Sequence, residues 1–420
     1  MRFFDYIDGE LCAETVPLRA IAEAVGTPTY VYSKATLEHH YNVLKAALHG
    51  LDINIAFAIK ANSNAAVIAT LATMGAGADT VSEGEILRAM RAGVPSNRIV
   101  FSGVGKTKRE LEFAIKTEIH QINVESEQEL ITIAEIANNL GKVQNVVIRV
   151  NPDVEAGGHS KIATGYATSK FGVSPATAFA MFENAKQLSG VKICGLAVHI
   201  GSQIIDIAPM RAAYEALALM VQQLRLSGHA ITRLDLGGGL GAIYDDKGEG
   251  PDLEAYGQMV REIIGPLGVK IEIEPGRLIC ANAGVLLARA LVTKANGGRE
   301  FVVIDAAMND LLRPAFYDAY HQILAVKEPP IGANLMPITV VGPICETGDT
   351  FTVDRPMAKV NPDDLLAFMS AGAYGFAMAS TYNSRPLAAE VMVSGDKWQV
   401  VRARQSYEDM WQGEVIPNWG

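Results

Sequence analysis

Lys60 is the side chain whose setting in the sequence most clearly indicates chemistry. It ends the apolar run 54–59, which we expect to be a buried strand, and the polar segment 61–64 follows it. An ammonium group at such a position loses hydration, so its pKa tends to fall, and the neutral amine can form a Schiff base with a carbonyl cofactor. The simpler alternative is a lysine that only ends the strand and reaches water.

A second pattern is rich in glycine. Gly237, Gly238 and Gly239 follow an expected strand that contains Asp235. Such a turn lets backbone N–H groups converge on an anion without interference from side chains, and a helix N-terminus after it adds a favourable dipole. The three glycines can also simply form a tight loop. A phosphate site together with a reactive lysine indicates pyridoxal 5′-phosphate as the cofactor.

His199 and Glu274 lie at the ends of two further expected strands and suit the ring of that cofactor. The imidazole of His199 can stack on the ring. The ring nitrogen draws electrons from a substrate most strongly when it is protonated, and a buried Glu274 would hold it so in a charge-assisted pair. The alternatives are a packed histidine and a surface carboxylate.

Short apolar runs alternate with helical patterns such as 126–141 and 207–228, and this unit repeats eight times. The repeat predicts an α/β chain with a (β/α)₈ TIM barrel, whereas a doubly wound sheet usually needs fewer strands and carries its glycine fingerprint after the first one. The expected strands are 54–59, 77–81, 98–102, 121–125, 146–150, 194–200, 232–236 and 270–274.

Barrel enzymes build their active sites at the carboxyl ends of the strands. Lys60, His199, the glycine turn and Glu274 all lie at or directly after the ends of expected strands, as that rule requires. Asp79 and Arg149 also lie at strand ends, and their roles stay open.

Beyond about residue 281 the sequence changes to strand-like segments separated by Gly, Pro and Asp turns. We therefore expect the barrel over 27–280 and a mainly β domain, of Greek-key or sandwich type, formed by 1–26 and 281–420. The strand-like residues 3–7 belong to this second domain. Its clearest strands are expected at 301–305, 337–342, 365–368 and 398–402.

Composition narrows the function further. The 420 residues carry a net charge of −10, which argues against nucleic acid or an anionic membrane as a partner. The N-terminus is acidic where a secretory signal would be apolar, and the four cysteines form no CxxC pair, so we expect a cytoplasmic protein without a metal site.

One motif favours a different function. The segment 101–107, Phe-Ser-Gly-Val-Gly-Lys-Thr, resembles the end of a nucleotide-binding loop, and 302–305 resembles its acidic partner strand. The full loop requires glycine at position 100, where this chain has Val100. A nucleotide hydrolase is therefore a weak alternative.

The order of motifs along nearly the whole chain resembles the fold-type III pyridoxal-phosphate decarboxylases, whose barrel is like that of alanine racemase. The motifs that carry the resemblance are 58–62, 199–203, 237–239, 274–277, 345–349 and 372–374. Three further segments resemble the branch of the family that acts on diaminopimelate: 309–317, 159–165 with 170–172, and 380–386.

The resemblance implies a role for each matching residue. Lys60 would bind the cofactor aldehyde, His199 would stack on the ring and Glu274 would hold its nitrogen. Cys345 would donate a proton, and it completes the catalytic set. The remaining cofactor contacts would be Ser202, Gly237, Gly238, Gly239, Gly276, Arg277 and Tyr374, and the substrate contacts would be Arg277, Arg313, Tyr317, Glu346 and Tyr374.

The implied reaction is decarboxylation of meso-2,6-diaminopimelate to L-lysine and CO₂. Two arginines and a tyrosine suit its far carboxylate, whereas the far end of ornithine or lysine is only an ammonium. The family also implies a head-to-tail homodimer in which Cys345 and Glu346 serve the partner's site. Without the resemblance, Cys345 would count as a packed thiol and Arg313 or Tyr317 as a solvated helix face.

Two alternatives of other kinds are kept. A sister decarboxylase would share the fold and act on another basic amino acid or a carboxylated polyamine. A non-catalytic cofactor-binding regulator would have lost site residues, and all of the candidates are present here.

Overall fold

The computed structural model describes residues 3–154, 169–245 and 248–419. The chain divides into two compact units. The first, the barrel unit, consists of Glu38–Ala242 and Glu249–Ile279. The second, the β unit, consists of Met1–Leu37, Ile243–Gly248 and Cys280–Gly420.

The barrel unit is built on a closed barrel in the order β10-β11-β12-β5-β6-β7-β8-β9, and every pairing in it is parallel. The structure confirms the predicted (β/α)₈ architecture and excludes the doubly wound sheet. The strands are β5 Ile53–Ala58, β6 Gly77–Thr80, β7 Ile99–Phe101, β8 Gln121–Val124, β9 Gln144–Arg149, β10 Val191–Ala197, β11 Arg233–Asp235 and β12 Lys270–Ile273.

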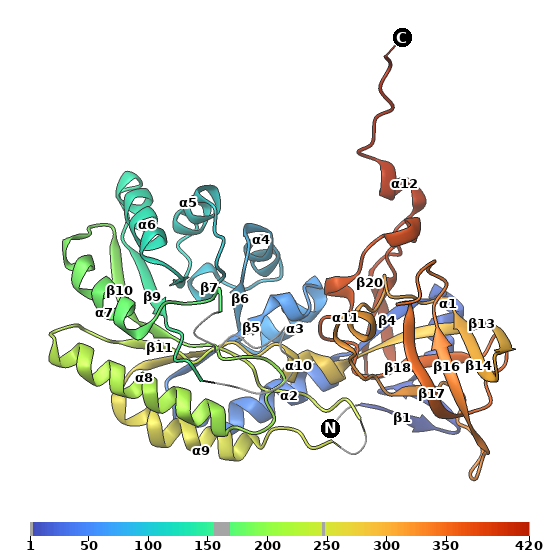
Figure 1. Cartoon of the computed structure of the whole chain (residues 1–420). Helices are drawn as coiled ribbons and strands as arrows, with labels where there is room; N and C mark the ends of the chain where they lie inside the picture. Colours follow the sequence, from blue (N-terminus) through green and yellow to red (C-terminus); the bar gives the residue numbers. More distant parts are fainter. Residues whose placement is uncertain (1–2, 155–168, 246–247, 420) are drawn as a thin grey trace. The chain divides into compact units, whose positions relative to one another are not determined.

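Helices surround these strands (Figure 1). Several begin with a polar cap in the loop after a strand: the side chains of Ser82, Thr107 and Ser126 accept bonds from backbone N–H groups of the first helical turn. The predicted helices 126–141 and 207–228 correspond to α6 and α8. The helices are α2 Lys34–Ala47, α3 Ala65–Thr73, α4 Glu83–Arg91, α5 Lys108–Lys116, α6 Glu127–Asn139, α7 Pro175–Asn184, α8 Ala208–Leu226 and α9 Leu253–Ile263.

The β unit contains a mixed nine-stranded sheet with the path β17-β16-β14-β13-β4-β19-β20, and β15 and β18 pair beside β13. Two of its pairings, β14 with β16 and β4 with β19, are parallel. The expected strands are present as β14, β16, β18 and β20. The bounds are β4 Thr29–Ser33, β13 Gly284–Asn296, β14 Arg299–Ile304, β15 Ile323–Ala325, β16 Leu335–Val341, β17 Thr350–Ala358, β18 Leu365–Phe368, β19 Ala389–Ser394 and β20 Lys397–Arg402.

Strand β4 belongs to a different unit from the one that the expected domain boundary gave it. We expected the barrel segment to begin at residue 27, but β4 pairs with β13 and β19 in the sheet of the β unit. All five residues of β4 are buried, as they would be in a barrel strand. A local pattern of this kind does not distinguish a strand of the barrel from a strand of the β unit.

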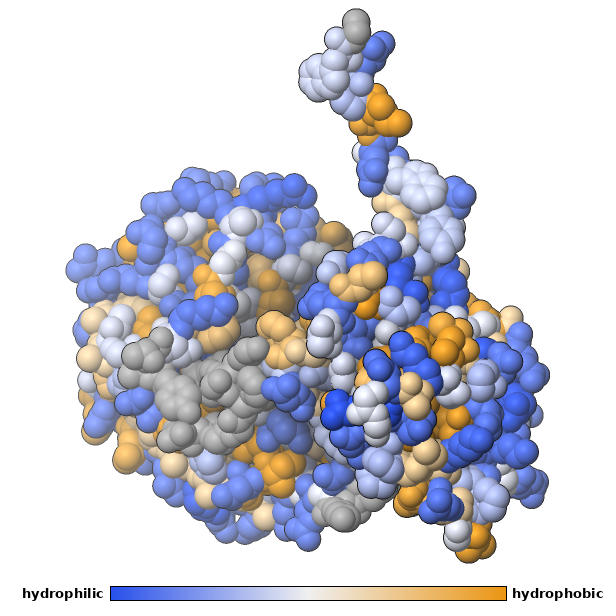
Figure 2. All heavy atoms as spheres, turned by 45° about the vertical axis from the view of Figure 1, so that its right-hand side comes forward, coloured by the Kyte–Doolittle hydropathy of each residue, from blue (hydrophilic) through white to orange (hydrophobic). Residues whose placement is uncertain are grey.

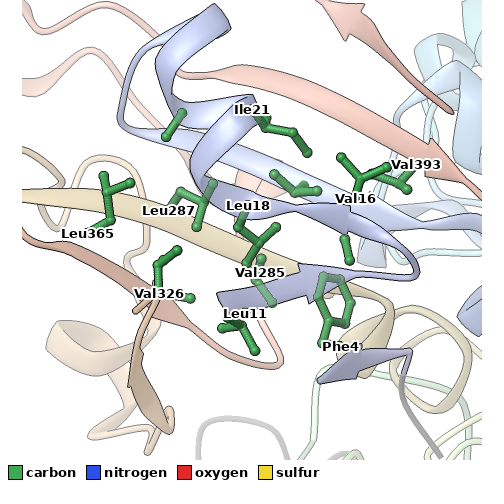
Figure 3. Packing of buried hydrophobic residues seen from close by; sticks show 14 of the residues in the cluster. Phe4, Leu11, Val16, Leu18, Ile21, Val285, Leu287, Val326, Leu365 and Val393 are labelled. Carbon is green, nitrogen blue, oxygen red and sulfur yellow. The ribbon is translucent and has the colours of Figure 1, made fainter. Parts of the chain in front are cut away.

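A three-stranded sheet of β1 Phe4–Ile7, β2 Glu10–Ala13 and β3 Val16–Pro17 covers part of the β unit together with α1 Leu18–Val25. Figure 3 shows its apolar side chains packed on residues of β13, β18 and β19. Burial of this apolar area stabilises the unit by about 25 cal/mol for each Å² removed from water. The cluster includes Phe4, Leu11, Val16, Leu18, Ile21, Val285, Leu287, Leu365 and Val393.

The chain ends in α12 Tyr407–Trp411 and an irregular segment. Val415 and Ile416 in that segment are 87% and 96% exposed, and Figure 2 shows the segment extending from the rest of the β unit. Among the described helices, none is both long and apolar enough to cross a membrane. The described residues also contain no cluster of side chains suited to a metal ion.

Candidate active site

The Lys60 amine is held by a buried carboxylate. Lys60 lies in a short 3₁₀ turn, Ile59–Ala61, directly after β5, and Asp79 lies in β6 next to it. Lys60 Nζ is 2.7 Å from Asp79 Oδ2, and the Asp79 side chain is fully buried while 35% of the Lys60 side chain is exposed. The amine therefore has a fixed position and remains accessible. This is more specific than a lysine that only reaches water.

His199, after β10, has a defined tautomer. The Gly238 N–H donates to His199 Nδ1 over 3.1 Å, so Nδ1 is an acceptor and the ring proton is on Nε2. Burial, and then the nearby charges of Arg149 and Lys60, hold the pKa of His199 well below its usual value. A neutral imidazole is suited to stacking, which stays a prediction for His199.

Glu274 follows β12 and is 7% exposed, which contradicts the surface-carboxylate alternative. Its Oε1 accepts bonds from Ser102 Oγ and Asn123 Nδ2, both over 3.2 Å. Burial, and then the negative charge of Asp235, raise the pKa of Glu274 well above its usual value. Burial raises the pKa of Asp235 to about 6. Both acids accept from the same amide, Asn123 Nδ2, and so form a buried carboxyl pair.

The glycine turn is constrained by close packing. A Cβ atom at Gly237 would lie 2.4 Å from Val198 O, and one at Gly238 would lie 2.2 Å from Glu274 O. These glycines are therefore required by the approach of neighbouring backbone, which supports part of the tight-loop alternative.

The amides of the turn are used unequally. Gly237 N–H donates to Asp235 Oδ1 and Gly238 N–H donates to His199 Nδ1. Within the described part of the chain, the N–H groups of Gly239 and Leu240 have no acceptor. A phosphate could therefore be bound by these two amides, of which we had predicted only the first.

Arg277 begins α10, Arg277–Cys280, and is 7% exposed. Its Nε and Nη2 donate to Ser202 Oγ over 3.2 and 3.1 Å, so two predicted contacts lie together. Gly276 precedes it, where a Cβ atom would lie 2.9 Å from Ala61 Cβ. The end of β12 thus approaches the Lys60 turn closely.

Arg149, whose role was open, forms a buried ion pair. Its Nη1 lies 2.7 Å from Glu125 Oε1, and its guanidinium lies 4.7 Å from the centre of the Phe171 ring. Glu125 Oε2 also accepts the Gly172 N–H over 2.6 Å. The motif at 170–172 is thereby anchored to the barrel, while the motif at 159–165 lies outside the described residues.

Lys106, the lysine of the nucleotide-loop alternative, has a structural role. The Lys106 side chain is 1% exposed. Its ammonium group donates to Gly103 O, Asn123 O and Glu129 Oε1 over 2.6 to 2.7 Å. Its three protons are thus all bonded within the barrel unit. This arrangement leaves none for a nucleotide phosphate and removes the support for that alternative.

In the β unit, Arg313 is held rigidly. It begins α11, Arg313–Tyr317, and its Nη1 donates to His321 Nε2 over 2.9 Å. His321 Nδ1 donates in turn to Met369 O over 2.8 Å, which fixes the neutral tautomer. The Arg313 guanidinium lies 4.5 Å from the centre of the Tyr244 ring. Arg313 is 7% exposed, so it is not on a solvated helix face.

Cys345 and Glu346 are presented by a loop that Asp349 supports. Asp349 Oδ1 and Oδ2 accept the N–H groups of Met308 and Ile344 over 2.7 and 2.8 Å. Cys345 is exposed, whereas the other three cysteines are buried, so the packed-thiol alternative is wrong. Glu346 is also exposed, and its nearby carboxylate raises the pKa of Tyr382.

Tyr317 and Tyr374 complete the predicted set in the β unit. The Tyr317 ring contacts Phe316 edge to face, with the ring centres 4.7 Å apart. Tyr374 has a positive φ of 56°, which is uncommon for a residue with a side chain. Just before it, a Cβ atom at Gly372 would lie 2.0 Å from Cys280 O, which explains the glycine of this motif.

Several residues around the site were missed from the sequence. They include Asn123, Ser102 and Gln121 in the barrel unit and His321 and Tyr244 in the β unit. A signal existed for Gln121 and Asn123, because polar side chains two residues apart in a buried strand share the barrel interior. For His321 and Tyr244 no local pattern indicated their partner.

Comparison with known proteins gives the family. Residues 34–281 match the family described as "Pyridoxal-dependent decarboxylase, pyridoxal binding domain". The chain is 48% identical to the diaminopimelate decarboxylase of Zymomonas mobilis over 99% of both chains. It is 43% identical to that of Aquifex aeolicus over 97% of this chain and 96% of the relative.

Solved structures of the same family resemble this chain. The diaminopimelate decarboxylase of M. jannaschii in complex with L-lysine has a TM-score of 0.93 at 35% identity and covers 99% of this chain and 98% of its own. That of Helicobacter pylori complexed with L-lysine has a TM-score of 0.90 at 39% identity, with coverage of 94% and 98%. The chain belongs to the diaminopimelate decarboxylase family of pyridoxal-dependent decarboxylases.

Proposed function

We propose that this chain uses pyridoxal phosphate to decarboxylate meso-2,6-diaminopimelate to L-lysine and CO₂. The observation that carries the proposal is the grouping of an accessible Lys60 amine, a neutral His199 and the buried Glu274 carboxyl in one barrel. The chain is also similar over 99% of its length to a diaminopimelate decarboxylase.

The described residues fit the cofactor. The amides of Gly239 and Leu240 lack acceptors among the described residues, and an anion would satisfy them. Asp79 Oδ1 is buried and likewise has no partner in the described part of the chain, which leaves it able to accept a further bond beside the Lys60 amine. Lys60 would bind the aldehyde, and Ser202, Gly239, Gly276 and Tyr374 would surround the phosphate.

Bound pyridoxal phosphate supplies an electron sink for the electron pair that remains when a carboxyl group leaves as CO₂. Asp79 holds the Lys60 amine in place through their 2.7 Å contact. His199, neutral and fixed as its Nε2–H tautomer, presents a flat face without adding positive charge. Glu274 holds the proton at the ring nitrogen.

Substrate recognition is assigned to Arg277, Arg313, Tyr317, Glu346 and Tyr374. A planar guanidinium held by His321 and Tyr244 loses little side-chain entropy when it binds a carboxylate, so Arg313 is suited to the far carboxylate of the substrate. Glu346 carries the negative charge that the far ammonium requires.

Cys345 is proposed as the proton donor. Because it is exposed on a loop that Asp349 fixes, its thiol is available to a second chain. We propose a head-to-tail homodimer in which Cys345 and Glu346 complete the partner's site. The proposal includes a cytoplasmic location and partners limited to this homodimer and its amino-acid substrate, without nucleic acid or membrane.

The deciding test is product analysis with a substrate panel. The purified, cofactor-loaded protein is incubated separately with meso-diaminopimelate, lysine, ornithine, arginine and a carboxylated polyamine, and CO₂ and the amine product are measured. The proposal predicts CO₂ and L-lysine from diaminopimelate at a kcat/KM at least about 100-fold above that for the others. If CO₂ is released only from another member of the panel, the chain is a sister decarboxylase. If no member of the panel releases CO₂, the result favours a non-catalytic cofactor-binding protein.

A further inference from the structure

The carboxyl pair of Asp235 and Glu274 is held by an amide that contacts both acids. Asn123 Nδ2 lies 2.8 Å from Asp235 Oδ2 and 3.2 Å from Glu274 Oε1. It also lies 3.0 Å from Ser102 Oγ, which itself donates to Glu274. Asn123 is 3% exposed and Asp235 is 1% exposed, so water does not replace these bonds.

The bonds to Asp235 indicate which acid carries a proton. Its Oδ1 accepts the Gly237 N–H over 2.9 Å. Its Oδ2 accepts from Asn123 Nδ2, and from Gln121 Nε2 over 3.2 Å. Both oxygens thus face N–H donors, which is the arrangement of an ionised carboxylate. Two buried carboxylates that share one amide donor disfavour a second negative charge, so the proton is on Glu274, whose contacts to Asn123 and Ser102 are longer.

We propose that Asp235 and Asn123 are positioning residues that orient Glu274 and hold it as a neutral acid in the cofactor-free protein. The proposal rests on the proposed role of Glu274 at the ring nitrogen. Its consequence is that the proton required at that contact is already on the protein before the cofactor arrives. Because Asp235 also binds the amide of Gly237, the same residue connects the orientation of Glu274 to that of the glycine turn.

Two substitutions shift the titration of Glu274 in opposite directions. Asp235→Asn removes the neighbouring negative charge that raises the pKa of Glu274, so this pKa falls. Asn123→Ser removes a donor to both carboxyl groups, so the ionised forms lose a stabilising bond and the pKa of the pair rises. Loss of fold alone does not produce opposite shifts.

The test is an infrared titration of the cofactor-free protein. The carbonyl band of protonated Glu274 is identified as the band lost in Glu274→Gln and is followed against pH. We expect the midpoint to fall by about one pH unit in Asp235→Asn and to rise by about one in Asn123→Ser. The matched control is Asp310→Asn, which removes another buried acid, in the β unit, and leaves the Glu274 midpoint unchanged.

A second readout is the cofactor dissociation constant, obtained from absorbance at fixed pH, which we expect to rise at least about tenfold in both variants. Unchanged midpoints in folded variants, or the absence of a Glu274 band, would overturn the proposal. If Asp235→Asn does not fold, Asn123→Ser alone still decides by the direction of its shift. If the midpoints shift but the wild-type protein releases no CO₂ from diaminopimelate, the proposed function fails and the positioning role stands.

Discussion

At the scale of single residues, the site consists of ionisable groups whose positions are set by named partners. Lys60 is held by Asp79, His199 by the Gly238 amide, and Glu274 by Asn123 and Asp235. Burial, and then nearby charges, lower the pKa of His199 and raise that of Glu274.

Replacing Lys60 by alanine should abolish the covalent attachment of the cofactor. We expect kcat to fall by about 1,000-fold or more, since the amine is the reacting nucleophile. Steady-state kinetics with diaminopimelate measure the loss. The control is Lys142→Ala, which removes a lysine bonded to Glu118 just before β9, and it should retain wild-type turnover. Full activity in Lys60→Ala would refute the covalent role.

Arg313 tests substrate recognition. Arg313→Lys keeps the charge but loses the planar fork and the geometry that His321 and Tyr244 support. We expect KM for diaminopimelate to rise by about tenfold or more while cofactor absorbance stays unchanged. Arg299→Lys, at an exposed ion pair with Asp354, is the matched control. Equal KM values in the two variants would remove Arg313 from the substrate site.

Residue types and order predicted the grouping of Lys60, His199 and Glu274, because strand ends in a barrel must converge. The hydrogen bonds that these residues and their neighbours make were not predictable. Which amide of the glycine turn binds Asp235 and which binds His199 depends on backbone directions that no residue type encodes. The same holds for His321 and Arg313, which lie in a turn without periodic pattern.

At the scale of elements, the turn after β11 has no room for an added side chain at Gly238. A Cβ atom at Gly238 would lie 2.2 Å from Glu274 O, a backbone atom that cannot move without displacing β12. Gly238→Ala should therefore lower the unfolding free energy by about 1–3 kcal/mol and weaken cofactor binding. Gly105→Ala, where nothing lies within 4 Å of the added Cβ, is the control. Thermal unfolding and cofactor titration of both variants give the comparison, and equal behaviour would contradict the packing explanation.

The eight barrel strands were predictable because each is a short apolar run between a helical pattern and a turn. Strand β4 falls within the segment 27–280 that was predicted as the barrel, and no strand was predicted at its position. Its membership in the β unit depends on long-range pairing with β13 and β19, which a local pattern does not contain.

At the scale of the whole molecule, each unit has its own buried acids. Burial raises the pKa of Asp310 in the β unit to about 7, from 3.8. The folded protein therefore binds more protons than the unfolded chain between about pH 4 and pH 7, and stability falls as pH rises through this window. Asp310→Asn should remove up to about 4 kcal/mol of this dependence, which denaturation across that pH range measures. Parallel stability curves for the two proteins would show that Asp310 is not the source.

The proposed homodimer predicts complementation between inactive variants. Lys60→Ala and Cys345→Ala each lack one part of the site, and a mixed dimer contains one complete site. After equal amounts are mixed and allowed to exchange subunits, random pairing should restore about a quarter of wild-type activity. Cys12→Ala, at a buried cysteine, replaces Cys345→Ala as the matched control and should be active without mixing. No recovery after proven exchange would contradict shared sites.

The most direct measurement of the central claim is reduction of the cofactor-loaded protein with borohydride, followed by mass spectrometry of its peptides. We predict that the cofactor mass is attached to the peptide that contains Lys60 and to no other, and that Lys60→Ala shows no attachment. Attachment at a different lysine, or a wild-type protein that takes up no cofactor, would contradict the account.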